Sequence, residues 1–189
     1  MTENNYAGED LRGTDFANQD LRKADFSGAN LSGVSLAGSN LSEANLRGAN
    51  LVNANLANVR AIRTIFSGAD ISKAHLAGAI LAGAGFRGAT LSDANLAGAN
   101  LRQAILAGAD ISNANLAGVN LEHARLKGAN LSDANLAGAN LTGASLIETH
   151  LVRTYLMGAN LTGADFKNAN LAGANFAGTN LQSARSIER

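Results

Sequence analysis

The chain of 189 residues contains no cysteine, no proline and no tryptophan. The absence of cysteine excludes disulfides and thiolate metal sites. The absence of proline means that every residue keeps a backbone N–H that can donate a hydrogen bond within a sheet. Aromatic residues make up only 4% of the chain, so the large rings that help to fill most globular cores are scarce.

Net charge and long apolar runs are also lacking. The 15 Lys and Arg residues balance the 15 Asp and Glu residues, so the protein is not acidic or basic as a whole. The polar start MTENNYAGED has no apolar core of a signal peptide, and no apolar run reaches the ~20 residues of a membrane span. We therefore expect a cytoplasmic protein that does not associate with a membrane.

What the sequence does contain is a period of five residues. A Leu, Phe or Ile stands at every fifth position from Leu11 to Leu181, and Ala61 is the exception. A small residue, usually Ala, stands two positions earlier, and Asn or Asp commonly lies between the two. The repeating unit is therefore a small residue, Asn or Asp, a large apolar residue, and two variable residues.

This period fits neither a helix nor a straight strand. In a helix, five residues rotate the large side chain by about 140°, which spreads it around the cylinder. In a strand, an odd repeat moves every second large residue to the opposite face. A short extended piece followed by a two-residue corner solves the problem, with the small and large residues inward and the Asn or Asp outward.

The number of sides in one coil follows from a longer repeat. The segment LSDANLAGAN occurs at 91–100 and again at 131–140, and related segments with Ser after the large residue recur at multiples of twenty residues. Four pentapeptides therefore make one coil, and about nine coils fit the chain. Coils stacked at ~4.8 Å would form a rod about 40 Å long.

The repeated unit resembles that of a known family. The runs ANLAGANL at 94–101 and ANLSDANL at 129–136 are similar to the A(D/N)LXX motif of the pentapeptide repeat proteins. The resemblance implies an all-β fold, a right-handed quadrilateral parallel β-helix, in which about nine 20-residue coils each consist of four pentapeptides. It also implies a bacterial source.

The expected domain organisation is one solenoid with short ends. We expect an N-terminal cap or tail at 1–8, the β-helix at 9–186 and a C-terminal tail at 187–189. A solenoid leaves open sheet edges at both ends, which is consistent with a monomer or an end-to-end dimer.

Interruptions of the repeat are the candidate binding sites, because regular coils are what folding alone requires. The first interruption lies around VRAIRTIF at 59–66, where Ala61 replaces an inward Leu. We expect Ile62 to swing inward there with a local bulge. The outward positions nearby would then form an apolar patch with basic neighbours, consisting of Arg60, Arg63, Ile65, Ile80 and Ile105.

The second interruption is SLIETHLVRTYLMGAN at 145–160. It places large or charged residues where other coils have Ser, Asn, Ala or Gly, and the candidates for protein binding are Ile147, His150, Val152, Arg153, Tyr155 and Met157. For both interruptions the alternative interpretation is sequence drift in a tolerant solenoid, since scattered surface apolar residues need no function.

No catalytic or cofactor site is expected. The histidines His75, His123 and His150 fall on different sides and coils, so no metal cluster or catalytic triad is indicated. The segment GAGFRG at 83–88 matches GxGxxG, but its glycines belong to repeat corners and no helix follows. We therefore expect that the protein is not an enzyme and that it binds neither a cofactor nor a small-molecule substrate.

The sequence favours a protein-binding scaffold or regulatory protein whose partner it does not identify. The alternative, implied by the resemblance, is a DNA-mimicking modulator of DNA gyrase or another type II topoisomerase, since some family members protect gyrase from quinolones or inhibit it in this way. A neutral chain with only a local acidic strip (Asp70, Asp93, Asp110, Asp133) supports that alternative weakly. A basic stripe of Arg47, Arg87, Lys127 and Lys167 without interleaved aromatic residues does not indicate nucleic-acid binding.

Overall fold

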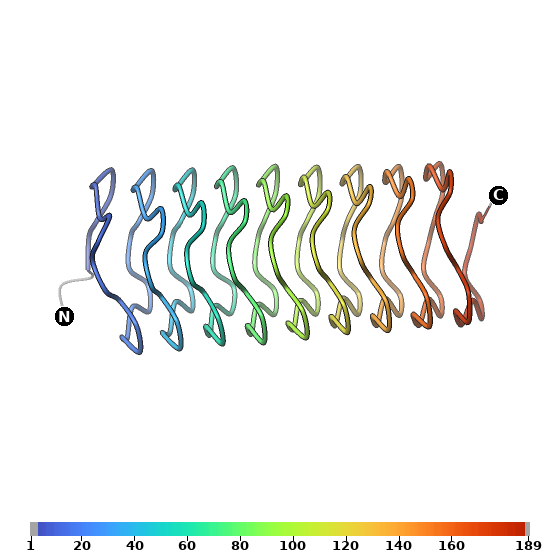
Figure 1. The fold of residues 1–189 in the computed structure, drawn as a ribbon, viewed down its shortest axis with the longest axis horizontal. Helices are drawn as coiled ribbons and strands as arrows, with labels where there is room; N and C mark the ends of the chain where they lie inside the picture. The colour runs from blue at the N-terminus through green and yellow to red at the C-terminus, as the bar shows by residue number, and fades with distance from the viewer. Residues whose placement is uncertain (1–3, 188–189) are drawn as a thin grey trace.

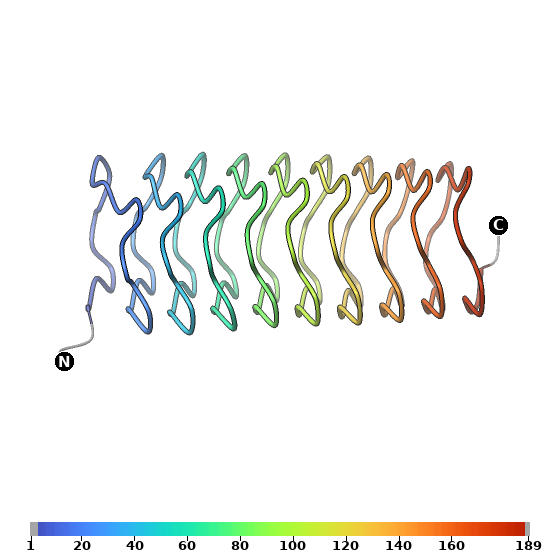
Figure 2. The ribbon, with the colours of Figure 1, turned by 90° about the horizontal axis from the view of Figure 1, so that it is seen from below.

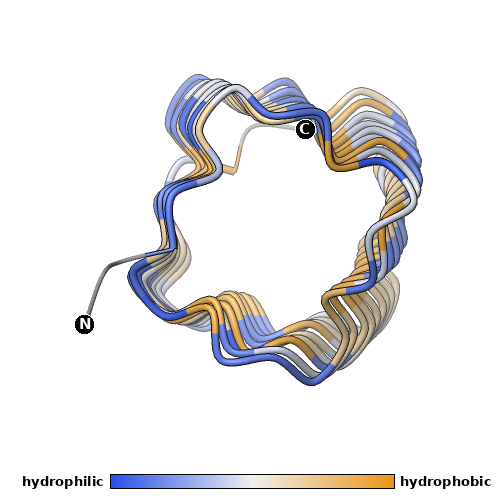
Figure 3. Cartoon of the chain, turned by 90° about the vertical axis from the view of Figure 1, so that its left-hand side faces the viewer, coloured by the Kyte–Doolittle hydropathy of each residue, from blue (hydrophilic) through white to orange (hydrophobic). Residues whose placement is uncertain are grey.

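The computed structural model of the protein describes residues 4–187. The chain winds as a rod whose coils lie side by side along the long axis, with the N-terminus at one end and the C-terminus at the other (Figures 1 and 2). Viewed along that axis, the coils superpose on a four-sided outline (Figure 3). No helix of the described residues has the length and apolarity that crossing a bilayer requires.

Pairing between coils confirms the twenty-residue period. Parallel bridges join residues twenty apart, from Asn5 with Asp25 to Asp165 with Arg185. Each bridge is one residue wide, so within residues 4–187 the sides are bridged extended pieces and not continuous strands. Because Asn5 already pairs with the next coil, the coil geometry begins before residue 9, inside the segment 1–8 that we expected to be a cap or tail.

The four sides are numbered from the coil at residues 89–108. Side 1 is 89–91, side 2 is 94–96, side 3 is 99–101 and side 4 is 104–106, each with its equivalents at intervals of twenty residues. The middle residue of each side carries the bridge and points outward, and the two residues that follow each side form a corner.

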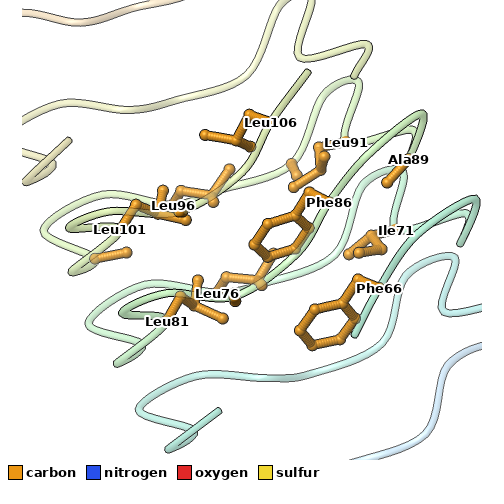
Figure 4. Packing of buried hydrophobic residues seen from close by; sticks show 14 of the residues in the cluster. Phe66, Ile71, Leu76, Leu81, Phe86, Ala89, Leu91, Leu96, Leu101 and Leu106 are labelled. Carbon is orange, nitrogen blue, oxygen red and sulfur yellow. The ribbon is translucent and has the colours of Figure 1, made fainter. Parts of the chain in front are cut away.

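The interior is a column of large and small apolar residues. The large residue of each side is buried from Leu11 to Phe166, and the Ala two positions earlier is buried with it in most coils. Figure 4 shows these side chains stacked from coil to coil, with the rings of Phe66 and Phe86 parallel at a centroid distance of 4.8 Å. Each coil therefore buries its apolar residues against the coils before and after it, as in other solenoids.

Hydrogen bonds explain why Asn or Asp stands at the outward position. In the pentapeptide 96–100, four of the five amides donate to backbone carbonyls, those of Leu96, Gly98, Ala99 and Asn100. The remaining amide, that of Ala97, donates to Oδ1 of Asn95 at 3.1 Å. The same side-chain bond recurs from Asn5 to Asn180. The outward Asn or Asp therefore caps the one corner amide that has no backbone partner.

Every corner also requires a left-handed residue. The second corner residue has a positive φ throughout, whether it is a glycine such as Gly98, at 66°, or a larger residue such as Asp93, at 60°. Of the 21 glycines in the chain, 20 occupy such positions. The exception is Gly85, which stands at an outward position of side 4 without a positive φ. The backbone does not require glycine there.

The expectation that Ile62 turns inward is wrong. Ala61 keeps the inward position and is fully buried, while Ile62 stays half-buried at the corner, with no bulge in its coil. The physical reason is the ladder between coils, because the Ala61 amide donates to the Ile80 carbonyl at 2.8 Å. Beside this site, the buried hydroxyl of Thr64 donates to the Leu41 carbonyl at 2.6 Å and ties two coils together.

The two ends of the rod differ. In the first described coil, Tyr6 stacks on Phe26 at 4.8 Å and meets the edge of Phe16 at 5.5 Å. In the last coil, the inward residues Leu171 and Leu181 are only partly buried.

Removing one cap tests the hydrogen-bond scheme. Asn115→Ala deletes the bond to the Ala117 amide and the side-chain bonds to Asn95 and Asn135. We expect the free energy of unfolding to fall by about 1 to 2 kcal/mol, measured by urea denaturation. Asn115→Asp keeps the acceptor for Ala117 and should lose less. Equal stability of Asn115→Ala and the wild type would contradict the scheme.

Two glycines form a matched pair for the corner geometry. Gly98 has a φ of 66° and nothing within 4 Å of an added Cβ, so Gly98→Ala introduces backbone strain alone. We expect a loss of about 1 kcal/mol. Gly85→Ala introduces no such strain and should leave the stability unchanged or raise it by about 0.4 to 1 kcal/mol. The melting temperature of Gly98→Ala should therefore fall below that of the wild type, whereas the melting temperature of Gly85→Ala should stay the same or rise. Equal changes in the two melting temperatures would refute the assignment of backbone strain to Gly98.

Candidate protein-binding site

Side 4 has the longest run of coils in which the outward residue is neither Asn nor Asp. Five consecutive coils lack an outward Asn or Asp in the column that follows Asn45, where the residues are Ile65, Gly85, Ile105, Arg125 and Ser145. On sides 1 and 2 the exceptions, such as Thr90 or His75, are single. Side 3 has two consecutive exceptions, Arg60 and Ile80, and they adjoin the run on side 4 across a corner. The departures from the repeat are therefore concentrated on one part of the rod.

Each of these departures removes a cap. Within residues 4–187, the corner amides of Ser67, Arg87 and Ala107 have no protein acceptor, whereas the equivalent amide of Arg47 is bonded by Asn45 at 3.2 Å. A net hydrogen bond contributes about 1 kcal/mol, less where water can replace the partner. The run on side 4 therefore gives up local stabilisation at successive coils, which folding alone does not explain.

An apolar patch lies in this region. The isoleucine patch consists of Ile65, Ile80 and Ile105, together with Gly85, which pairs with both Ile65 and Ile105. Ile65 is 39% exposed and Ile80 is 37% exposed, which makes them two of the four exposed large apolar residues within residues 4–187. The structure thus brings these predicted residues together around the corner between sides 3 and 4.

Arginines without acidic partners surround the isoleucine patch. We call Arg47, Arg60, Arg63, Arg87 and Arg125 the arginine frame, and within residues 4–187 none of them has a carboxylate within 4.0 Å. A parallel β-bridge joins Arg60 to Ile80 on side 3, and another joins Arg125 to Ile105 on side 4, so each arginine lies one coil from an isoleucine. The side chain of Arg63 extends over Gly83 of the next coil, since its Cγ would be 3.6 Å from a Cβ at that position.

The other arginines are mostly neutralised. Arg12 and Arg22 pair with Asp10 and Asp20 beside them, and Arg102 pairs with Glu122 at 3.3 Å. Such exposed pairs add little stability, but they cancel local charge. Of the arginines within residues 4–187, only Arg185 and the arginine frame have no carboxylate within 4.0 Å, so the frame is a local excess of positive charge on a neutral protein.

The second interruption is not gathered in the same way. Ile147 lies at the corner that follows side 4, His150 on side 1, Val152 at the next corner, Tyr155 on side 2 and Met157 at the corner after it. Tyr155 is 52% exposed and Met157 is 48% exposed, while Ile147 and Val152 are half-buried. These candidates therefore spread around one coil and face several directions.

The charge of the second interruption is also compensated. Arg153 donates from Nε and Nη2 to the carboxylate of Asp133 in the preceding coil, at 2.7 and 2.6 Å. The hydrogen bonds from Arg153 lower the pKa of the Asp133 carboxyl. Inside the same coil, the hydroxyls of Thr149 and Thr154 donate to the carbonyls of Leu146 and Leu131, so both threonines are satisfied interior residues.

Several residues of this site were missed in the sequence. The sequence alone places Gly85 among the corner glycines and Arg47 and Arg87 in a separate basic stripe, whereas Gly85 is an outward residue of side 4. The twenty-residue register could have placed Gly85 between the two isoleucines, but only the structure identifies which arginines lack acidic neighbours. Within residues 4–187, no group of three or more His, Asp or Glu residues could hold a metal ion.

Comparison with known proteins agrees with this architecture. The pentapeptide repeat family model matches in eight partly overlapping copies that run from residue 10 to residue 185. No curated protein sequence gives a significant match.

Two solved structures illustrate the likeness. HetL, a pentapeptide repeat protein involved in heterocyst differentiation regulation from the cyanobacterium Nostoc sp. Strain PCC 7120, is 31% identical, with a TM-score of 0.46, over 95% of this chain and 87% of that chain. A trypsin-treated form of QnrB1, a plasmid-mediated fluoroquinolone resistance protein, is 23% identical, with a TM-score of 0.59, over 95% of this chain and 84% of that chain. The motif, the coils and the match over nearly all the described residues together establish that the chain belongs to the pentapeptide repeat family.

Proposed function

We propose that the protein is a non-enzymatic scaffold or regulatory protein that binds another protein through the isoleucine patch and the arginine frame. The observation that carries the proposal is the run of five coils on side 4 that lack the capping Asn or Asp, continued across the corner by Arg60 and Ile80. Drift would be expected to scatter such losses over all four sides.

The physical form of the surface supports this proposal. Bridges hold the outward residues of neighbouring coils in register, at a spacing of about 4.8 Å. A partner therefore meets side chains that are already positioned, which lowers the entropy lost on binding. We take the winding of this scaffold to be right-handed, as the family resemblance implies.

DNA mimicry toward gyrase has less support. Of the acidic strip, Asp133 is paired with Arg153, and Asp70 and Asp110 accept hydrogen bonds from the amides of Ser72 and Ser112. Duplex DNA carries one charge per ~1.7 Å, so a mimic needs a dense row of carboxylates without neutralising partners. The likeness to QnrB1 concerns the fold alone.

Restoring the repeat on side 4 tests the proposal. In the double variant Ile65→Asn/Ile80→Asn, each new Asn can cap its corner amide, while the apolar contacts of the isoleucines are lost. We expect the free energy of unfolding to stay within about 1 kcal/mol of the wild type. Affinity capture from a bacterial lysate, quantified by mass spectrometry, should lose a protein that the wild type retains.

A matched variant distinguishes the two interruptions. Tyr155→Asn restores the repeat on side 2 in the same manner and should retain the captured protein. If both variants capture the same proteins as the wild type, drift explains the interruptions. If only Tyr155→Asn loses a partner, the second interruption is the binding site. Gyrase in the eluate, together with altered supercoiling, would favour the DNA-mimicry alternative.

A further inference from the structure

We propose, building on the function proposed above, that the isoleucine patch binds an acidic protein segment that places one apolar side chain over Gly85. The flanking carboxylates of that segment pair with the arginine frame.

The position above Gly85 is open on the protein surface. A Cβ built on Gly85 has Ser67 Oγ as its nearest non-neighbouring atom, at 4.0 Å. Ile65 and Ile105 stand one coil to either side, so their Cα atoms are about 10 Å apart. That separation leaves room for one apolar side chain to pack between the two isoleucines.

Glycine at this position is not explained by the backbone. Gly85 is the glycine of the chain that lacks a positive φ, and no nearby atom would obstruct a larger side chain. An Asn would fit there and could cap the amide of Arg87, as Asn95 caps the amide of Ala97. The absence of a side chain therefore has a local cost, which contact with a bound segment would offset.

The positive charge of the arginine frame indicates that the bound segment is acidic. Arg60 precedes Ile80 on side 3, and Arg63 lies at the corner between sides 3 and 4. Arg87 lies at the corner that follows side 4, and Arg125 follows Ile105 along side 4. The nearby Glu43, Glu122 and Glu148 are already paired with Lys23, Arg102 and Lys127. Carboxylates of a partner can therefore form bidentate pairs with guanidinium groups that, among the described residues, have no carboxylate within 4.0 Å.

Nucleic acid fits this surface less well. Phosphates would pair with the arginines, but they would leave the central isoleucines without an apolar partner. Single strands are usually held by stacking on aromatic residues. The exposed ring of Tyr155 lies on side 2, away from the isoleucine patch. An acidic segment with an apolar residue satisfies both the charge and the hydrophobic centre.

Selection of peptides on the whole protein tests the inference. A phage-displayed library of random peptides is selected on the wild type at physiological salt, and enriched peptides are synthesised with a fluorescent label. We expect enriched sequences in which Asp or Glu flank an apolar residue. Their affinity should fall at least about tenfold in Gly85→Asn and in Arg60→Gln/Arg87→Gln.

Two control variants keep folding effects separate. His75→Asn makes the same kind of restoration on side 2. Lys73→Gln removes a cation that, among the described residues, also has no carboxylate within 4.0 Å but lies at another corner. Both should bind the selected peptides as the wild type does. Gly85→Asn should unfold at the same urea concentration as the wild type or at a higher one, so loss of binding there cannot come from unfolding.

The remaining outcomes overturn the inference in distinguishable ways. Enriched peptides without acidic residues that still depend on Gly85 would refute the charge argument and leave the proposed binding face standing. Peptides indifferent to Gly85→Asn, or no enrichment at all, would refute the site, and the lysate capture would then decide the proposed function independently. Binding of a labelled random DNA duplex that is lost in Arg60→Gln/Arg87→Gln would replace the protein segment with nucleic acid.

Discussion

The amide at the first position of each corner is the constraint on which the surface of this protein depends. Four of the five amides in a pentapeptide bond to backbone carbonyls, and this one does not, as Ala97 illustrates. The outward side chain two residues earlier must accept a hydrogen bond from this amide, or the amide must bond to water. The outward residue therefore caps a corner amide in most coils. A residue such as Ile65 or Gly85, which cannot accept that hydrogen bond through its side chain, indicates a requirement other than folding.

Interior and exterior constrain the sequence in different ways. Inward positions accept a large apolar residue and a small one, which is usually Ala and sometimes a Ser or Thr whose hydroxyl bonds to a backbone carbonyl, because each coil packs directly on the next. Outward positions can change at a cost of about one hydrogen bond. A solenoid can consequently acquire a binding surface on one side without rebuilding its core, provided that the losses are few.

Much of this architecture could be predicted from the sequence. The five-residue spacing identified the inward residues, and the repetition of LSDANLAGAN identified the twenty-residue coil that the bridges confirm. The prediction for Ile62 failed because it treated Ala61 as an isolated vacancy, whereas hydrogen bonds from neighbouring coils fix the backbone of that side. The grouping of the arginine frame could not be predicted either, since ion pairing depends on where long side chains extend.

The packing at the N-terminal end gives the protein a natural optical probe. The chain has two tyrosines and no tryptophan, so tyrosine dominates its near-ultraviolet signal. Tyr6 of the first described coil packs against both Phe16 and Phe26, in an asymmetric aromatic environment, whereas Tyr155 is half exposed on side 2. The near-ultraviolet circular dichroism of the protein should therefore report mainly on whether its first coil is closed. Fraying of that end can thus be followed without a label while the remaining coils stay intact.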